Sequence, residues 1–536
     1  MGRTTARKTL SRSGGSASSN LVPHSIVAAA AVLVLSGGAA LVLSGWKHIV
    51  NSADTEAVER LVALGDGFDA IVGTAGTPRT VPRIQWDPNE PLAAWLGKLS
   101  IPVVFNNSEI EHWAARKSWD FEFMERVLPD TITADVSTNP SSGTMVYREN
   151  KMSAVTLAKT LGNTVGVRTH TAKQLPKHTF FEAIRAGRPF MRYGGGLKKW
   201  VGGENKASDL EHDVNGWKSL AGLTSMPDLI RQLDRRDLTQ LQPRRSQLDA
   251  RQLDIWVGGA GVRSSAHFDP HNNVFVQLHG TKRFVLSPPS DCQYFDMFPT
   301  THPHSRQAQT QHYLYGKSLP KGFYAAEVDA NTSNPVSAVR AVTVDLAPGE
   351  LLWLPAFWVH AAEAMTPTIS VSVVAPAAET ILFENLQDGG LLWTMPFLNE
   401  TTDGWDVPRL ATALRVFIPA LLEGLRPRLQ HWAAYQSARA NETHGVVQYI
   451  LRRMWSLNVR HELGVNGQTK FPCGETSDGD RKAALEAVPR AIARFAPIRN
   501  ETLPIFVTMY VELLHSHIKL PLGINFLEQC LDQVAV

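Results

Sequence analysis

Residues 264–273 read SSAHFDPHNN and run directly into VFVQLHGTKRFVLSPP. Two histidines, an aspartate and two asparagines therefore stand where a buried strand is expected to begin. Because residues i and i+2 of a strand point the same way, His267 and Asp269 should project together, with Phe268 on the opposite face. Three interpretations compete: a hydrogen-bonded turn, a structural zinc site and an open iron site. On its own, the His-x-Asp pair favours a hydrogen-bonded core histidine.

A second stretch, residues 347–360, changes this balance. It reads APGELLWLPAFWVH and contains a turn, an apolar strand, a proline break and then His360, which a short loop separates from the next strand. A β-sandwich can bring His360 back beside the first pair. Two histidines and one carboxylate would then fill one face of an octahedron and leave the other open, as in non-heme iron oxygenases. A structural zinc would need four closed ligands, usually with cysteine. His271 would supply the fourth only if the strand stays regular across Pro270.

Composition excludes several classes of protein. The net charge of +3 is close to neutral for 536 residues, and the basic residues are spread out except at the N-terminus, so no nucleic-acid-binding domain is expected. The three cysteines, Cys292, Cys473 and Cys530, are far apart. Their odd number argues against a disulfide scaffold and a cysteine-based zinc site, and at most one disulfide can form.

The N-terminus predicts a membrane anchor. Residues 1–24 form a basic, acid-free tail, and residues 25–46 are expected to form a transmembrane signal anchor, since IVAAAAVLVLSGGAALVLSGW carries no charge and can cross about 30 Å of hydrocarbon. The basic side should stay in the cytosol. The chain is then a single-pass type II membrane protein with a lumenal catalytic body, in the endoplasmic reticulum or secretory pathway. The acid-free start also resembles a mitochondrial presequence, and that alternative stays open.

Acceptor sequences for N-glycosylation agree with a lumenal body. Five N-x-[ST] matches are only slightly more than chance gives, and they predict a glycoprotein. They lie at Asn106, Asn331, Asn399, Asn441 and Asn500.

Beyond the anchor, the sequence divides into four regions. Residues 47–83 read as a membrane-proximal linker, 84–241 as a mixed α/β flank, 242–390 as a mostly β domain and 400–536 as a helical region. In the β domain, short apolar or alternating runs separated by Gly or Pro turns predict a sandwich or barrel. The expected strands are 253–257, 274–278, 284–286, 341–345, 350–354 and 368–374.

Helices are expected on both sides of this domain. Residues 113–127 look helical, and 175–187 read as an amphipathic helix closed by Gly187. From residue 405 on, apolar residues fall at helical spacing, and Pro419 and Pro427 should break or kink the first helix. The C-terminal helices are expected to supply core and a homodimer surface.

Several segments together resemble the JmjC domain. They are IWVGGAGVRSSAHFDPHNNVFVQLHGTKRFVLSPPSD, HPHSRQAQ and APGELLWLPAFWVHAAEAMTPTISVSVV, with IPVVFNNSEIEHWAARKSWDFEFM upstream. The resemblance covers roughly residues 84–376. It is closest to the small hydroxylase branch, also described as cupin-like, to which the asparaginyl hydroxylase that inhibits the hypoxia-inducible factor belongs.

This resemblance implies a double-stranded β-helix, a jelly roll that binds Fe(II), with 2-oxoglutarate as cosubstrate and dioxygen as oxidant. It implies that His267, Asp269 and His360 are the iron ligands. Lys282 stands where the family places the cation that pairs with the far carboxylate of 2-oxoglutarate. Such a buried dicarboxylate needs a fixed positive partner or strong donors.

The resemblance also implies that Ser264 and Asn273 hydrogen-bond the cosubstrate. Ser370 and Ser372 share a strand face and are weaker candidates for the same pocket, while Phe357 and Trp358 are expected to wall the site. For the tyrosine that many relatives use on the cosubstrate carboxylate, the motif segments offer no counterpart, and Tyr193 is the candidate from outside them.

The function that follows from the resemblance is hydroxylation of a protein side chain. His-x-Asp, in place of His-x-Glu, resembles the hydroxylases more than the demethylases. Two alternatives stay open: an oxygenase acting on a nucleic acid or small molecule, and a catalytically silent JmjC-like binding module.

Overall fold

The structure of the protein is a computed structural model, which describes part of the chain. The described residues are 80–85, 99–106, 113–146, 169–196, 252–308, 340–386, 407–436, 446–453, 471–518 and 526–531, with short gaps inside four of these ranges. The predicted anchor at 25–46 lies outside them, as do most of the linker and the sequons at Asn331, Asn399 and Asn441. None of the helices within the described ranges is both long and apolar enough to span a bilayer.

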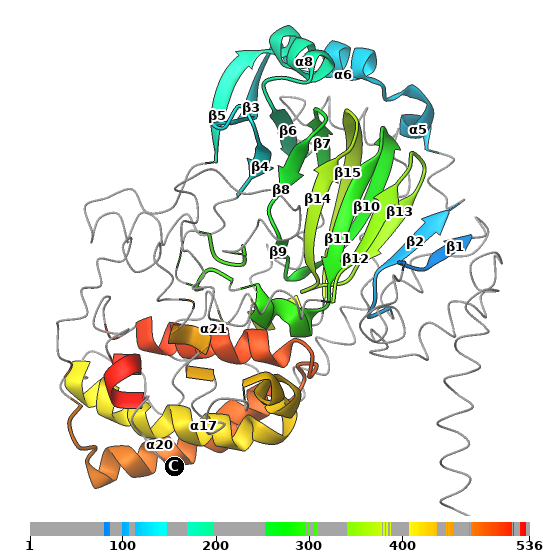
Figure 1. The fold of residues 1–536 in the computed structure, drawn as a ribbon. Coiled ribbons are helices and arrows are strands. Elements are labelled where there is room, and N and C mark those ends of the chain that lie inside the picture. Colours follow the sequence, from blue (N-terminus) through cyan, green and yellow to red (C-terminus); the bar gives the residue numbers. More distant parts are fainter. Residues whose placement is uncertain are drawn as a thin grey trace, which may run out of the picture. The chain divides into compact units, whose positions relative to one another are not determined.

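Two β-sheets form the centre of the fold (Figure 1). Neighbouring strands are antiparallel except for the β1–β2 and β4–β8 pairs, which are parallel. The larger sheet runs in the order β1 (Arg83–Gln85), β2 (Val103–Asn106), β13 (Leu351–Leu354), β10 (His271–His279), β15 (Thr368–Pro376), β7 (Gln252–Gly258), β6 (Met191–Gly196), β3 (Thr131–Ser137) and β5 (His170–Pro176). The smaller sheet runs β12 (Val342–Leu346), β11 (Lys282–Ser287), β14 (Val359–Ala364), β8 (Val262–Ser264) and β4 (Gly143–Met145), and β9 (His267–Phe268) pairs with β14.

The predicted mostly β core is thus confirmed, and its sheets are consistent with a cupin-like jelly roll. All six expected strands are present, each with slightly different ends. Burial follows the sequence pattern: β12 reads VTVDL and alternates buried and exposed residues, whereas β13 reads LLWL, lies between β2 and β10, and is wholly buried.

Two local expectations differ from the structure. His267 does not belong to one long regular strand, because the chain breaks at Asp269 and Pro270 between β9 and β10. His360 lies inside β14, which is not among the strands expected from the sequence. Both differences have one cause. Strands β9, of two residues, and β14, of six, pair with distant parts of the chain, and local periodicity does not reveal such partners.

The turn between β10 and β11 depends on a glycine. Gly280 has a φ of 72°, and a Cβ built there would lie 2.0 Å from the carbonyl oxygen of Pro367. Only glycine tolerates both the left-handed backbone and the close approach. This turn fixes where β11 starts and hence where Lys282 projects.

Three helices of the flanking α/β part lie at one end of the sheets. The expected helix at 113–127 is two helices, α5 (Ala114–Ser118) and α6 (Phe121–Val127). Asp120 separates them, because its side chain accepts a hydrogen bond from the amide of Phe123 at 2.7 Å and caps α6. The other predicted helix is confirmed as α8 (Lys177–Ala186), and it ends at Gly187 with a φ of 73°.

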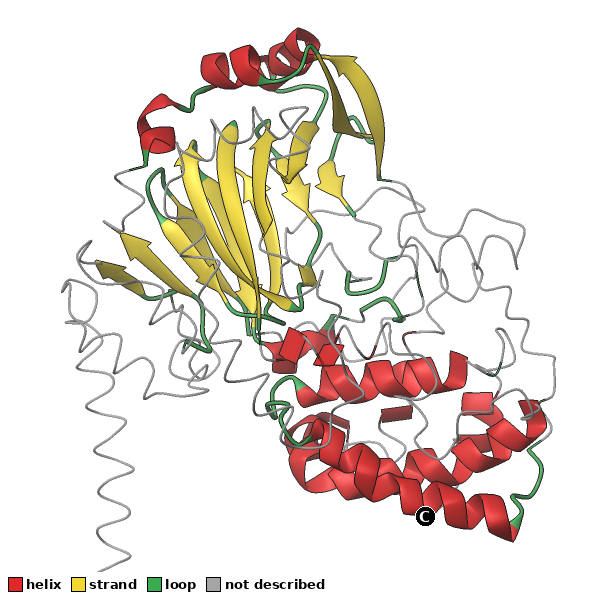
Figure 2. Cartoon of the chain, turned by 180° about the vertical axis from the view of Figure 1, so that it is seen from behind, coloured by secondary structure: helices red, strands yellow, loops and turns green. Residues whose placement is uncertain are grey.

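The C-terminal region is helical, as predicted, and lies at the β9 end of the sheets (Figures 1 and 2). Its elements are α17 (Val407–Gln436), α20 (Asp478–Phe495), α21 (Leu503–Ser516) and the short π-helix η5 (Leu527–Leu531), and the 3₁₀ helix η2 (Pro289–Tyr294) contacts α21. Of the break or kink expected at Pro419 and Pro427, the break is wrong, because α17 continues through both.

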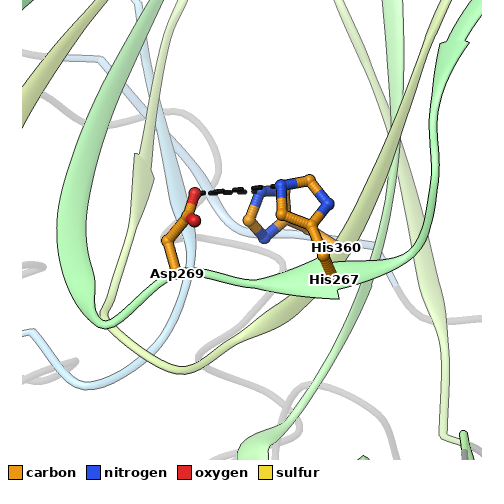
Figure 3. A group of neighbouring side chains, drawn as sticks. All are labelled: His267, Asp269 and His360. Carbon is orange, nitrogen blue, oxygen red and sulfur yellow. Dashed lines mark ion pairs between the residues drawn. The ribbon is translucent and has the colours of Figure 1, made fainter. Parts of the chain in front are cut away.

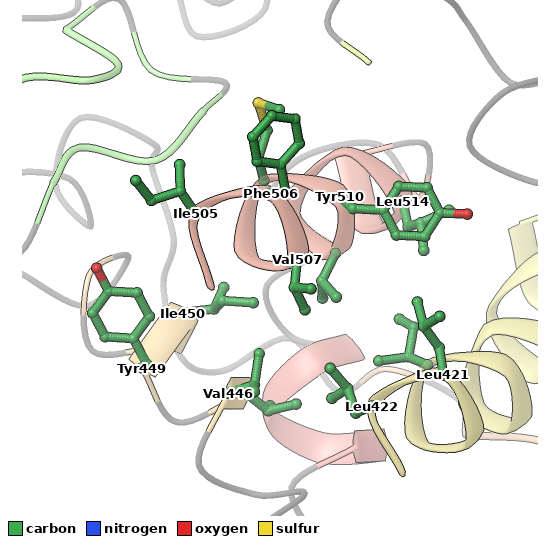
Figure 4. Close-up of a cluster of buried hydrophobic side chains, with 14 of the residues drawn as sticks. Leu421, Leu422, Val446, Tyr449, Ile450, Ile505, Phe506, Val507, Tyr510 and Leu514 are labelled. Atoms are coloured by element: carbon green, nitrogen blue, oxygen red, sulfur yellow. The ribbon is translucent and has the colours of Figure 1, made fainter. Parts of the chain in front are cut away.

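Burial accounts for the continuity of α17. A proline inside a helix costs about 3 kcal/mol. Leu414, Leu421 and Leu425 are wholly buried in the apolar core that α17 forms with α20, α21 and residues 446–451, so apolar packing offsets that cost. Figure 4 shows Leu421 facing the side chains of α21. Cys473 and Cys530 also form a disulfide with Cα atoms 5.5 Å apart, which ties the segment before α20 to η5, while Cys292 is a buried thiol.

Aromatic contacts join the helical region to the centre of the β domain. The ring of Phe268 lies 6.3 Å from that of Phe383 and 5.9 Å from that of Phe357. Phe506 on α21 packs on Phe357 and Phe383 at 5.3 and 5.9 Å. Since Phe268 separates His267 from Asp269 in the sequence, α21 supports the segment that carries both polar residues.

Phe506→Ala is therefore expected to lower the free energy of unfolding by about 3–5 kcal/mol, the usual cost of deleting a buried phenylalanine. Urea denaturation followed by near-ultraviolet circular dichroism measures this change. Leu485→Ala on α20 is the control, since Leu485 is 46% exposed and should change stability by less than about 0.5 kcal/mol. Equal effects of the two substitutions would contradict the supporting role of α21.

Candidate functional site

His267, Asp269 and His360 meet in space (Figure 3). His267 on β9 is registered directly opposite His360 on β14, and Asp269 follows β9. The Oδ2 atom of Asp269 lies 3.8 Å from Nε2 of His267 and 3.7 Å from Nε2 of His360. One ligating atom of each residue lies within 4.8 Å of the others. The strand pairing thus brings together residues that are 93 positions apart in the sequence (360 − 267).

Backbone carbonyls fix the orientation of both imidazoles. Nδ1 of His267 lies 2.6 Å from the carbonyl oxygen of Ser265, and Nδ1 of His360 lies 3.0 Å from that of Trp358. Because a carbonyl can only accept, each Nδ1 carries the proton and donates it. Each Nε2 therefore presents a lone pair toward Asp269, which is the tautomer that a metal ion requires.

The electrostatics of the cluster also favour a bound cation. Burial and, to a smaller extent, the neighbouring His267 lower the pKa of His360 to about 4, so His360 is neutral near pH 7. Burial alone would raise the pKa of Asp269, but His267, His360 and Arg306 outweigh it and lower that pKa to about 2. Nη1 of Arg306 lies 3.3 Å from Oδ1 of Asp269, whereas both histidines face the other carboxylate oxygen, Oδ2.

These three residues fit a divalent metal ion. Two atoms bound to one ion at about 2.1 Å can be at most about 4.2 Å apart, and both separations from Asp269 meet that limit. Within the described ranges, this is the group of three or more ligating side chains close enough to share an ion. His271 does not belong to it, and neither does a cysteine, so the four-ligand zinc interpretation loses its fourth ligand.

A cavity of about 390 Å³ opens beside the cluster, a volume within the range of small-molecule sites. Residues of both sheets line it. They include His267, Asp269 and His360, the predicted cosubstrate residues Ser264, Asn273 and Lys282, and also Arg192, Asp254, Trp256, His271, Phe275, Arg306, Thr368 and Ser372.

The three predicted cosubstrate residues leave hydrogen-bonding capacity in this cavity. The Ser264 hydroxyl accepts from the amide of Ala362 at 3.0 Å, so its proton is still available. Oδ1 of Asn273 is buried without a hydrogen-bond partner. A buried polar atom of this kind costs free energy until water or a ligand binds it. The site therefore suits a ligand with several oxygen atoms.

Lys282 carries the strongest signal for an anion. Its Nζ lies 4.8 Å above the ring of Phe275, and none of the described carboxylates pairs with it. Burial, together with the positive charge of Arg192, lowers the pKa of Lys282 to about 7. An anionic ligand would offset both effects.

The other predicted pocket residues divide into two groups. Ser372 lines the cavity, whereas Ser370 donates to Gln277 at 2.9 Å inside the sheet. Neither Phe357 nor Trp358 lines the cavity: Phe357 packs in the aromatic cluster behind it, and the Trp358 indole donates to the carbonyl of Ser100. Tyr193, the candidate for the cosubstrate carboxylate, does not line the cavity either.

Sequence reasoning missed two cations of this cavity, Arg192 and Arg306. Arg306 belongs to the segment HPHSRQAQ, and the backbone of that segment accepts a hydrogen bond from the amide of Phe268. The sequence could have indicated Arg306, because it is the cationic residue of a polar segment that carries the family resemblance. The sequence gives less indication of Arg192, since only the alternation of side chains along β6 decides whether Arg192 or Tyr193 faces the cavity.

Known proteins place the chain in a family. The cupin-like domain family matches residues 90–374, more than half of the chain, and the protein belongs to that family. Jumonji C domain-containing protein 5 of Drosophila melanogaster is 31% identical over 120 residues, which are 22% of this chain and 26% of that relative. Lysine-specific demethylase JMJ31 of Arabidopsis thaliana is 25% identical over 251 residues, 44% of this chain and 42% of the relative.

A third relative is named for the synthesis of tRNA wybutosine. The tRNA wybutosine-synthesizing protein 4 of Neurospora crassa is 31% identical over 123 residues, 23% of this chain and 8% of that protein. The chain thus matches less than half of the length of each of these three relatives.

Lys282→Met is expected to stabilise the protein without ligands at low pH. The ammonium group is held at a pKa of about 7 in the fold and has an ordinary pKa of 10.5 when unfolded, so its burial costs most below pH 7. The cost falls as the pH rises from 7 to 10.5. Since Lys282 is only half-buried, solvent reduces the effect, and a gain of about 1–3 kcal/mol is expected at pH 6.

Urea denaturation of both proteins at pH 6 and pH 9 tests this expectation. The difference between Lys282→Met and the unchanged chain should shrink at pH 9. The exposed Lys173→Met, on β5, is the control and should show no such trend. A difference that is the same at both pH values would contradict the lowered pKa of the half-buried ammonium.

Proposed function

We propose that this protein is an Fe(II)- and 2-oxoglutarate-dependent dioxygenase that hydroxylates a side chain of a protein substrate. The observation that carries the proposal is the pairing of a His267–Asp269–His360 cluster with a cavity whose wall includes the cationic Lys282. Membership of the cupin-like family supports it.

In this proposal, His267, Asp269 and His360 would hold the iron beside the cavity. The two backbone carbonyls keep the imidazoles in the ligating tautomer. Arg306 holds the second oxygen of Asp269 and so restricts the carboxylate to one ligating oxygen. Bound iron and 2-oxoglutarate would supply the oxidation that inserts one oxygen atom of dioxygen into a C–H bond, with succinate and carbon dioxide as the other products.

The cavity residues then position the cosubstrate. Lys282 pairs with its far carboxylate, while Ser264 and Asn273 hydrogen-bond its oxygen atoms. Orientation of the keto acid toward the metal is the contribution of the protein, and the chemistry belongs to the metal and cosubstrate.

A protein side chain is the substrate we favour. Asp269 gives the His-x-Asp form that resembles the hydroxylases, and the spread of basic residues over the sequence gives little support to RNA, although one relative is named for its part in tRNA wybutosine synthesis. A silent binding module has no need for two imidazoles held in the ligating tautomer beside a carboxylate.

The purified full chain should release succinate in a manner that depends on both Fe(II) and 2-oxoglutarate. His267→Ala should reduce this release to background because it removes an iron ligand. His178→Ala on α8 is the matched control, since His178 is exposed and far along the chain from the cluster, and it should leave the rate unchanged.

The substrate class is tested in cells. Mass spectrometry should find protein peptides that gain one oxygen atom in cells with the protein and not in cells with His267→Ala. Succinate release without any such peptide would sustain the oxygenase and overturn the protein substrate. Absence of iron-dependent release from a folded chain would favour the silent module.

We also propose that the catalytic body faces the lumen of the secretory pathway, behind a type II anchor at residues 25–46. The charge-free run in that segment supports the anchor. The Cys473–Cys530 disulfide supports an oxidising compartment. Asn500, a predicted acceptor of a glycan, is exposed in the loop between α20 and α21.

Glycosidase treatment should therefore increase the mobility of the cellular protein on a gel, and Asn500→Gln should remove one glycan step. Asn139→Gln is the control, because Pro140 blocks that site. A protein without any glycosidase shift and with reduced thiols at both cysteines would place the body in the cytosol or mitochondrion instead.

A further inference from the structure

Strand β9 has a second neighbour besides β14, in the segment that carries Arg306. His267 forms an antiparallel bridge with Gln307, and the amide of Phe268 donates to the carbonyl oxygen of Arg306 at 3.2 Å. The side chain of Arg306 reaches Asp269, with Nη1 3.3 Å from Oδ1. One short stretch of chain therefore supports both the backbone and a carboxylate of the metal cluster.

The backbone of Arg306 has an unfavourable conformation. Its φ of 68° lies in the left-handed region, and within the described ranges Phe357 is the other residue besides glycine with a positive φ. The amide of Phe357 donates to the carbonyl oxygen of Asp269 at 2.7 Å, so both residues hydrogen-bond the segment 267–269. Conformations of this kind persist only where the surrounding contacts impose them, and they cluster at functional sites.

The contacts that impose it come from a further stretch, residues 297–300, which we call the outer segment. The amide of Phe298 donates to the carbonyl oxygen of Gln307 at 2.8 Å. The amide of Ala308 donates to the carbonyl oxygen of Ala266, directly before β9, also at 2.8 Å. The carbonyl of Gln307 and the amide of Ala308 belong to one trans peptide and point opposite ways. The chain at these two residues therefore lies between β9 and the outer segment.

Two buried charges of the C-terminal helical region hold the outer segment. Arg453 donates from Nε to the carbonyl oxygen of Met297 at 2.7 Å and from Nη2 to that of Phe298 at 3.2 Å. Glu512 on α21 accepts at Oε2 from the amide and the hydroxyl of Thr300, at 2.8 and 2.6 Å. Nη2 of Arg453 and Oε1 of Glu512 lie 3.0 Å apart, so the two charges also pair with each other.

This ion pair is placed where it adds little to stability. Glu512 is fully buried and the Arg453 side chain is only 6% exposed, and the cost of removing two such charges from water can exceed the gain from their attraction. The best-attested use of a buried ion pair is to fix register. The register within its reach is that of the outer segment, which neighbours the left-handed backbone of Arg306.

We propose that Glu512 and Arg453 are positioning residues of the metal centre. They keep the outer segment in register, the outer segment keeps Arg306 in its left-handed conformation, and Arg306 holds Oδ1 of Asp269. The metal affinity of the β domain then depends on two side chains of the helical region that do not line the cavity beside the cluster. This inference rests on the metal site of the function proposed above.

The test is titration of Mn²⁺ into the full chain, followed by electron paramagnetic resonance. Glu512→Gln leaves the guanidinium of Arg453 without its counter-charge and so loosens the hold on the outer segment. It should weaken Mn²⁺ about threefold to tenfold, less than the 10- to 100-fold typical of a direct partner of a metal ligand, because a carboxylate that is no longer held must be ordered when the ion binds. Asp480→Asn is the matched control: its carboxylate pairs with Arg409 between α20 and α17, and the Kd should stay within about twofold.

A double-mutant cycle separates positioning from general destabilisation. In the Arg306→Met background, Glu512→Gln should change the Kd of Mn²⁺ by less than about twofold, since the residue through which it acts is already absent. Leu414→Ala on α17 removes a fully buried side chain of the same helical region. It should lower stability and still leave the Kd of Mn²⁺ within about twofold.

The proposal is overturned if Glu512→Gln does not weaken Mn²⁺, if it weakens Mn²⁺ equally with and without Arg306, or if Leu414→Ala weakens Mn²⁺ as much. If Glu512→Gln does not fold, Thr300→Val decides: it removes the hydroxyl that donates to Glu512 and should weaken Mn²⁺ about threefold, in the chain that retains Arg306 alone. If the unchanged chain binds no Mn²⁺, the proposed function fails together with this inference. If it binds one ion and the variants bind it equally well, only the positioning role fails.

Discussion

The pairing of β9 with β14 is the constraint on which the rest of the site depends. It is short, yet it sets His267 opposite His360 and directs both Nε2 atoms at the carboxylate of Asp269. A strand slip of one residue would turn each imidazole to the other face. Two devices resist that slip: the carbonyls that fix both Nδ1 atoms, and the aromatic packing of Phe268 on Phe357 and Phe383.

Charged side chains of both signs line the cavity. The carboxylate of Asp269 belongs to the metal cluster, while Lys282 and Arg192 project from β11 and β6. In the protein alone this arrangement costs free energy, since a half-buried ammonium has no carboxylate partner among the described residues. An anionic ligand beside Lys282 would compensate this cost. Functional sites commonly retain such unfavourable features, because the ligand relieves them.

Sequence patterns were sufficient for the β domain, the helical C-terminal region and the three clustered side chains. The runs 274–278 and 350–354 predicted strands because their burial follows from local apolarity. Regularity across Pro270 stayed open and strand β14 was missed, because both depend on partners far along the chain. The effect of Pro419 was misjudged because packing against α21 offsets a cost that local rules treat as decisive.

For the cavity, the sequence identified side chains by type and could not assign their direction. Ser264, Asn273 and Lys282 do line the cavity, and Ser370 does not. Arg192 was overlooked in favour of Tyr193, because the phase of a short strand with three glycines cannot be read from six residues. Only the register with β7 shows which of the two faces inward.

Titration of Mn²⁺ into the full chain, followed by electron paramagnetic resonance, tests the central claim most directly. We predict one ion per chain, with an affinity that His360→Ala weakens by more than about a hundredfold, beyond the cost of losing an outer-shell partner. His271→Ala should retain the ion with nearly unchanged affinity. Binding that survives the loss of His360, or that depends equally on His271, would contradict a three-residue metal centre built by the β9–β14 pair.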